Sequence, residues 1–245
     1  MIASPPTRVV PFDRPADLGR VGQAPELMSI NLQARIVDLR RNLLAMGAEV
    51  ESRVTNAVHA LRTGDIELAT RIKGGDEAVD QMQIDIENEC MRLLALGQPV
   101  ASDLRLVVTV LRMSGEFERI ADLAKGIAKR VIKLANGPVI RIPESLLEMA
   151  DATHGMVTEV MQLLANPELD RCLQLRRDDK RVDQLNKEVL VWSRDEIHRD
   201  VDHTQASIDI LATAQRLERM ADICTSAAED LIFLVEGRIL RHGAE

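Results

Sequence analysis

The apolar and polar positions between residues 100 and 135 separate cleanly when the segment is drawn as a helix of about 3.6 residues per turn. Glu118 and Asp122 lie at the edge of the apolar side, and residues 202–236 place Glu218 and Asp222 in the same way. The apolar side, which predicts the core, consists of Leu106, Val110, Phe117, Ala121, Ala124 and Ala128. The other side, which we expect to face solvent, carries Arg105, Arg112, Arg119 and Arg130.

Glycine, proline and asparagine mark the ends of the predicted helices. The breaks fall at Thr63-Gly64, Gly74-Gly75, Gly97-Gln98-Pro99, Asn136-Gly137-Pro138 and Asn166-Pro167. They predict helices over residues 26–62, 76–96 and 100–135, then two that start near 143 and 168, and a last one over 202–236. Asp65 is a suitable N-cap for the segment after the first break. Residues 1–25 hold five of the nine prolines, so we expect a flexible tail there.

The two halves of the chain repeat one another. The segment ERIAD at 118–122 returns 100 residues later as ERMAD at 218–222. The repeat predicts an all-α fold of two tandem, pseudo-symmetric antiparallel three-helix bundles, joined end to end near residues 136–142. The expected domains are the tail at 1–25, a first bundle at 26–137 and a second bundle at 138–240.

Each half also carries two pairs of acids spaced by four residues, so that both members of a pair project from one face of a helix. An isolated pair of this kind is usually a solvated surface feature, but repetition of residue type and phase favours a shared role. Carboxylates that converge beside apolar side chains need cations to neutralise them. We therefore predict a metal site in each half, with these ligands: Asp76, Asp80, Glu118, Asp122, Asp179, Asp183, Glu218 and Asp222.

Oxygen ligands without cysteine or histidine favour a hard ion such as Mg²⁺, Mn²⁺, Ca²⁺ or ferric iron over zinc. Asp76 follows Gly74-Gly75 directly and has an alternative role as an N-cap. Three further pairs have the spacing of bundle iron ligands but do not recur in the other half, and we interpret them as surface residues: Asp151/His154, Asp195/His198 and Asp200/His203.

Composition narrows the classes of function. Aromatic residues make up only 2% of the chain, which is typical of a helical bundle, and the net charge of −8 argues against nucleic acid or an anionic lipid surface as a partner. Cys90, Cys172 and Cys224 are far apart and indicate no disulfide framework, and we interpret Cys224 as a packed core residue. Without a signal peptide or a long apolar run, we expect a cytoplasmic protein. Glycine-rich phosphate loops and metalloprotease motifs are absent, so nothing in the sequence indicates nucleotide hydrolysis.

The stretch QPVASDLR at 98–105, together with the acid motifs on either side of it, closely resembles the PhoU family of phosphate-system regulatory proteins. The likeness extends over about residues 28–240 and covers both repeats. It implies metal clusters held by the E(D)-x-x-x-D motifs, no catalysis, and negative regulation of phosphate uptake and of the phosphate-starvation response. The partners that it implies are the ATPase subunit of the phosphate ABC transporter, a membrane sensor histidine kinase and a second copy in a homodimer, with membrane contact only through partners.

Two other classes stay open on the residues alone. A carboxylate-bridged metalloenzyme would use the same acids for redox or hydrolytic turnover, although no E-x-x-H pair supports it. A purely structural helical scaffold would leave the acids as solvated charge. Added Mg²⁺ or Mn²⁺ would then leave its melting temperature unchanged, because only a ligand that binds the folded form raises stability.

Overall fold

Helices account for nearly all of the chain that the computed structural model describes, which is residues 25–75 and 77–237, with side chains from residue 32 onward. The elements in chain order are α1 (Pro25–Thr63), α2 (Ile66–Gly74), α3 (Glu77–Arg92), the π-helical turn η1 (Leu93–Gly97), α4 (Ala101–Ala135), α5 (Glu144–Ala165), α6 (Leu169–Arg199), the 3-10 turn η2 (Val201–His203) and α7 (Thr204–Glu236). No strand occurs within these ranges, so the all-α prediction is confirmed. The predicted tail and Asp76 lie outside the described residues, except for Pro25.

The helix ends follow the local chemistry that the sequence contains. The carboxylate of Asp65 accepts a hydrogen bond of 2.9 Å from the backbone N–H of Leu68, as an N-cap does. Gly64, just after α1, has a φ of +69°, a conformation that glycine adopts without steric cost. Helix α6 begins at Leu169 with Glu168 as its N-cap, which agrees with the predicted start near residue 168.

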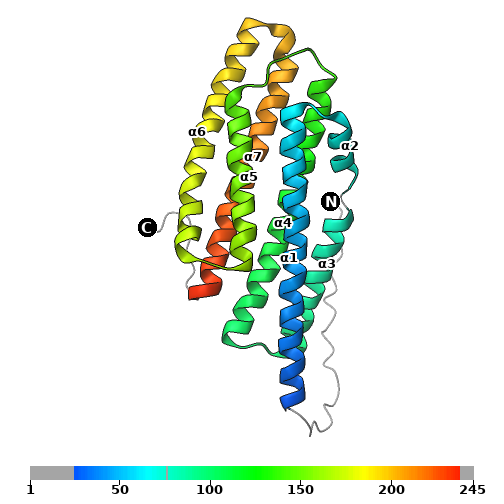
Figure 1. Ribbon diagram of the computed structural model, residues 1–245, viewed down its shortest axis with the longest axis vertical. Helices are drawn as coiled ribbons and strands as arrows, with labels where there is room; N and C mark the ends of the chain where they lie inside the picture. Colours follow the sequence, from blue (N-terminus) through cyan, green and yellow to red (C-terminus); the bar gives the residue numbers. More distant parts are fainter. Residues whose placement is uncertain (1–24, 76, 238–245) are drawn as a thin grey trace, which may run out of the picture.

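The helices form two bundles that lie side by side (Figure 1). The first consists of α1, α3 and α4 with the short α2 packed on it, and the second consists of α5, α6 and α7. Helix α4 runs along α7, and α1 runs along α5. The predicted end-to-end arrangement is therefore wrong. Apolar side chains of both bundles are buried in one continuous core, and small residues such as Ala121, Ala124, Ala221 and Ala228 lie in that core on α4 and α7.

Ion pairs across the α4–α7 contact show that the arginine side of α4, predicted to face solvent, does so only in part: Arg112 and Arg119 are exposed, whereas Arg130 is partly covered. Arg112 pairs with Asp230 at 2.7 Å, and Arg130 pairs with Asp209. Both aspartates are almost fully buried on α7. A helical wheel describes one helix and cannot show a second bundle beside it, which is why the sequence alone did not reveal these ion pairs.

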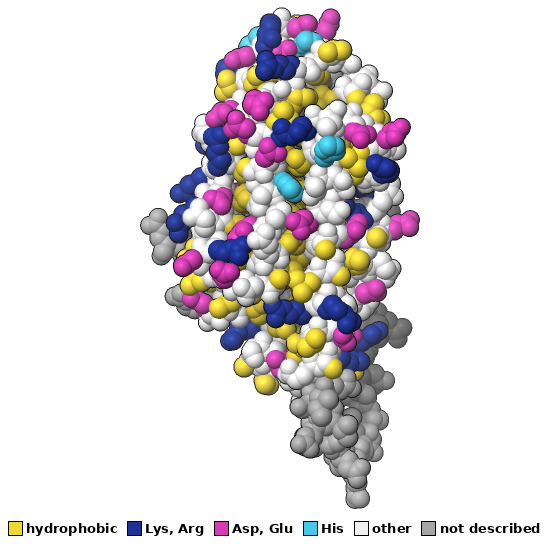
Figure 2. All heavy atoms as spheres, in the orientation of Figure 1, with side chains coloured by type: hydrophobic (Ala, Val, Ile, Leu, Met, Phe, Trp, Pro, Cys, Tyr) yellow, Lys and Arg dark blue, Asp and Glu magenta, His cyan; other side chains and the backbone are white. Residues whose placement is uncertain are grey.

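The opposite side of the molecule, where α1 meets α5, carries a mixture of acidic and basic side chains (Figure 2). Several of them link the two bundles. The Arg62 guanidinium donates to the Asp151 carboxylate at 2.6 Å, and the Thr55 hydroxyl lies 2.9 Å from Nε2 of His154. Over the described residues, no helix combines the length and the apolar character that crossing a bilayer requires.

Candidate functional site

Three of the four acids predicted for the first bundle lie close together. Glu118 and Asp122 stand one turn apart on α4, and Asp80 comes from the neighbouring α3. Glu118 is half-buried, whereas Asp80 and Asp122 are exposed. Burial raises the pKa of Glu118 above its ordinary value, and the negative charges of Asp122 and Asp80 raise it further. The fourth predicted ligand, Asp76, lies outside the described residues.

The second bundle repeats this arrangement with Asp183 of α6 beside Glu218 and Asp222 of α7. Burial is again the largest cause that raises the pKa of Glu218, followed by the charges of Asp222 and Asp183. Asp179 stands one turn before Asp183 on α6. Burial raises the pKa of the Cys224 thiol inside the bundle, and the charges of Glu116 and Asp179 raise it further, so Asp179 too lies near α7.

The two acid sets differ in one neighbour. In the second set the Asn186 side chain hydrogen-bonds Glu218 and lowers its pKa. Gln83 of α3 stands at the matching position of the repeat, but its amide donates to Glu87 on its own helix at 2.8 Å. Glu118 therefore lacks the compensation that Glu218 receives.

The acids lie in rows along the helices and do not surround one point. Among the described residues, no three histidine, cysteine, aspartate or glutamate side chains are placed to hold one ion together. Mg²⁺ commonly keeps several of its waters and binds proteins through one or two carboxylates, so hydrated hard ions fit such rows. The paired acids Glu118 with Asp122 and Glu218 with Asp222 are the residues that would hold them.

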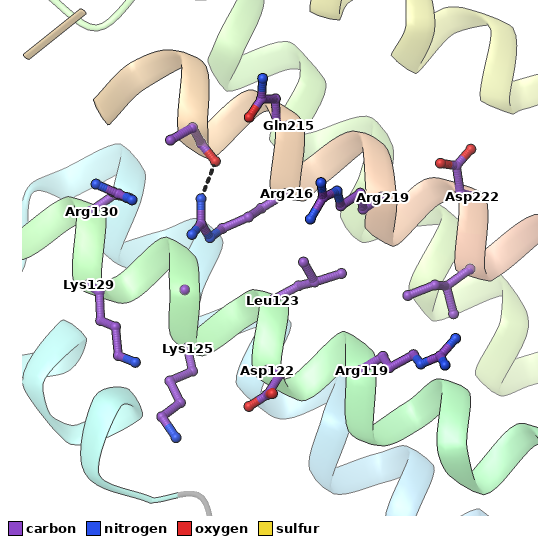
Figure 3. Close-up of a pocket in the computed structure, with 13 residues that line it drawn as sticks. Arg119, Asp122, Leu123, Lys125, Lys129, Arg130, Gln215, Arg216, Arg219 and Asp222 are labelled. Carbon is purple, nitrogen blue, oxygen red and sulfur yellow. Dashed lines mark hydrogen bonds between the residues drawn. The ribbon is translucent and has the colours of Figure 1, made fainter. Parts of the chain in front are cut away.

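A groove separates the two acid sets where α4 and α7 cross (Figure 3). Its volume is about 910 Å³, and the sequence analysis did not predict it. The groove is lined mainly by charged side chains: Arg119, Asp122, Lys125, Lys129, Arg130, Arg216, Arg219 and Asp222. Burial lowers the pKa of Arg216, and the positive charges of Arg130 and Arg219 lower it further.

Comparison with known proteins agrees with the duplicated architecture. The model of the PhoU domain matches the chain twice, over residues 43–131 and over residues 146–231. The chain belongs to the PhoU family. Each matched span contains one complete set of the predicted acids, and each covers the helices that position that set.

Two PhoU relatives match nearly the whole chain. The phosphate-specific transport system accessory protein PhoU of Serratia marcescens is 31% identical over 215 residues, which is 88% of either chain. The phosphate-specific transport system accessory protein PhoU homolog of Pseudomonas aeruginosa is 34% identical over 216 residues, covering 88% of this chain and 89% of the relative.

Solved PhoU structures have the same fold. The crystal structure of PhoU from Pseudomonas aeruginosa matches with a TM-score of 0.81 and 34% identity, over 84% of this chain and 100% of that one. The phosphate transport system regulatory protein PhoU from Streptococcus pneumoniae matches with a TM-score of 0.75 and 28% identity, over 87% and 99%. The predicted pair of tandem helical bundles is thus the fold of this PhoU chain.

Two histidines of this PhoU chain contact residues outside the acid rows. His154 contacts Thr55 of α1, and His203 lies 2.7 Å from the carboxylate of the buried Glu196. His203 is therefore not the simple surface residue that the sequence analysis expected. Cys224 is fully buried in α7, as predicted.

Proposed function

We propose that this chain is a negative regulator of phosphate uptake and of the phosphate-starvation response. In this role it is a non-enzymatic, metal-binding adaptor between the ATPase subunit of a phosphate ABC transporter and a membrane sensor histidine kinase. The names of its PhoU relatives, accessory and regulatory proteins of phosphate transport, support the phosphate role. The observation that carries the adaptor role is the repeated carboxylate row on α4 and α7, with Asp80 and Asp183 beside it.

The carboxylates within each row repel one another, so each row needs positive charge nearby to be stable. Hard divalent or trivalent ions such as Mg²⁺, Mn²⁺ or Fe³⁺ prefer oxygen ligands, whereas zinc more often binds nitrogen and sulfur. A bound ion would change the surface around Glu118 and Glu218 from a repelling acidic row into a neutral, ordered one. Such a surface suits docking of a protein partner, because unpaired like charges oppose association.

The metalloenzyme alternative is weakened by where the histidines are. Bundle enzymes with carboxylate-bridged metals use a histidine three residues after a glutamate that faces the core. Here His154 and His203 contact Thr55 and Glu196 instead of the acid rows.

The proposal also includes a cytoplasmic location and self-association as a homodimer. Gel filtration with light scattering would test whether the protein is a homodimer.

Metal content tests the ligand assignment directly. The double variant Glu118→Ala, Asp122→Ala should lose the metal of the first bundle and keep that of the second, and Glu218→Ala, Asp222→Ala should do the reverse. Inductively coupled plasma mass spectrometry after gel filtration measures the content. Asp195→Ala serves as the matched control, because Asp195 is an exposed acid whose carboxylate pairs with the adjacent Arg194. Unchanged metal content in both double variants would show that these acids are not the ligands.

The regulatory role is tested in cells grown with abundant phosphate. Deletion of the gene should raise secreted alkaline phosphatase activity, and the intact gene should lower it again. Metal-site variants that are present at normal abundance should fail to lower it. Activity that stays low after deletion, in a strain without a second PhoU gene, would contradict the role as a repressor.

A further inference from the structure

The groove between α4 and α7 concentrates positive charge in a chain whose formal net charge is −8. Six basic and two acidic side chains line it. The acids, Asp122 and Asp222, are exposed members of the two carboxylate rows. A further acid, Asp209, pairs with Arg130 at one end of the groove.

Three of the arginines in the groove have carboxylates nearby but form no direct ion pair with them. Arg119, Arg216 and Arg219 form no ion pair with any other residue in the described part of the chain. Arg216 donates instead to the backbone carbonyl of Ala212 on its own helix, at 2.6 Å. In Figure 3 Arg216 extends from α7 toward α4, while Lys125 and Lys129 leave α4 on the side away from α7. The groove therefore has cationic side chains on both helices.

The position of Arg216 depends on a glycine of the facing helix. A Cβ atom built on Gly126 would lie 2.4 Å from Nε of Arg216, well inside contact distance. Only glycine at this point of α4 leaves room for the guanidinium to lie across the helix. Packing thus places the Arg216 side chain before any ligand arrives, which lowers the entropic cost of binding.

The dimensions of the groove favour an anion with several charges in a row. Residues 119–130 of α4 extend for about 16 Å along the helix axis, and the groove volume of about 910 Å³ is far larger than a single phosphate ion needs. Guanidinium groups bind phosphate oxygens in a bidentate way that fixes their orientation. Arg119 and Arg219 stand at equivalent positions of the repeat, so the groove also offers a nearly symmetric pair of cations.

We propose that this groove binds a linear oligophosphate, with its phosphoryl groups lying between Arg119, Arg216 and Arg219. The free inorganic chain and the triphosphate of a nucleotide share this chemistry. The groove borders the acid rows at Asp122 and Asp222, but the proposed site uses the arginines and does not rest on the regulatory role proposed above. Its failure would leave that role intact.

Isothermal titration calorimetry of the full-length protein tests the site. EDTA is present throughout, so that the anion cannot bind through a metal ion. Inorganic triphosphate should bind, with an affinity that falls as salt rises and that exceeds those of pyrophosphate, orthophosphate and sulfate in that order. ATP is the final ligand. Affinity equal to that of triphosphate points to a nucleotide source, and weaker binding points to the inorganic chain.

Two variants and a control make the test specific. Arg216→Gln should weaken triphosphate binding at least tenfold. Gly126→Ala keeps every charge but displaces Arg216, and it should weaken binding without lowering the melting temperature. Arg41→Gln removes a cation that is 72% exposed on α1 and pairs with Asp38, and it should change nothing.

Three results would overturn the proposal. The first is the absence of triphosphate binding to the intact protein, and the second is an equal loss of binding in Arg216→Gln and Arg41→Gln. The third is a glutamate-rich peptide that binds the groove while triphosphate does not, which would make the groove a docking site for acidic protein segments.

Discussion

Asp230 is an acid held almost completely out of solvent where α7 meets α4. One of its oxygens pairs with Arg112, and the other has no hydrogen-bond partner among the described residues. Burial raises its pKa to about 6, with a further increase from Glu229 and a decrease from Arg112. Burial raises the pKa of Glu116, on the facing side of α4, to about 8, and the negative charge of Asp230 contributes to the increase. The inter-bundle contact thus contains two acids that hold their protons more tightly when the protein is folded.

The raised pKa of Asp230 predicts how stability changes with pH. Between about pH 4 and pH 6 the folded protein binds more protons at Asp230 than the unfolded chain does, so the free energy of unfolding falls as pH rises. Asp230→Asn should remove this dependence on pH, which amounts to a change in the free energy of unfolding on the order of 2 kcal/mol across the range. Urea unfolding at half-unit pH steps measures it. An unchanged slope in Asp230→Asn would place the titrating group elsewhere.

Single residues also show what the sequence could and could not reveal. Glu118 and Glu218 were identifiable because a repeat preserves both residue type and helical phase. Arg130 and Arg216 gave no such signal, since neither is matched by a basic residue in the other half. Their shared role depends on the crossing of two helices far apart in the chain, which no local pattern encodes.

At the scale of elements, helix ends were predictable and helix contacts were not. Glycine, proline and N-cap aspartate act on their immediate neighbours, so the breaks near residues 64, 97 and 137 could be read directly. The packing of α1 on α5 could not be predicted in this way, because it depends on which apolar side chains each bundle leaves uncovered. An example is Gly47 of α1, where an added Cβ would lie 2.7 Å from Met161 of α5 and 3.3 Å from Phe117 of α4.

A matched pair of glycine variants tests this close approach. Gly155→Ala in α5 meets no atom within 4 Å, so it should stabilise the protein by about 0.5–1 kcal/mol through helix propensity alone. Gly47→Ala should lose that gain or destabilise the protein, because Met161 and Phe117 must move. Thermal and urea unfolding of both variants provide the comparison. Equal stabilisation by the two substitutions would show that α1 and α5 are not in close contact at Gly47.

At the scale of the whole molecule, the continuous core predicts that both bundles unfold together. The partly buried pair of Arg130 with Asp209 connects them, and removing Asp209 leaves the Arg130 charge without its partner. Asp209→Ala should cost about 3 kcal/mol while calorimetry still shows one transition. The exposed Asp195→Ala should cost less than about 0.5 kcal/mol. Two separate calorimetric transitions in the intact protein would contradict the coupling.

The ion pairs at the α4–α7 crossing are not related by the symmetry of the repeat. Position 130 of the first half corresponds to position 230 of the second, where arginine is replaced by aspartate, and Arg112 corresponds to Ala212. If two first halves met through this surface, Arg112 of one would face Arg130 of the other. The charges therefore favour joining a first half to a second half and oppose joining two first halves. The two halves have diverged since the duplication and are no longer interchangeable. During assembly, the charges on this surface direct a first half to pack against a second half.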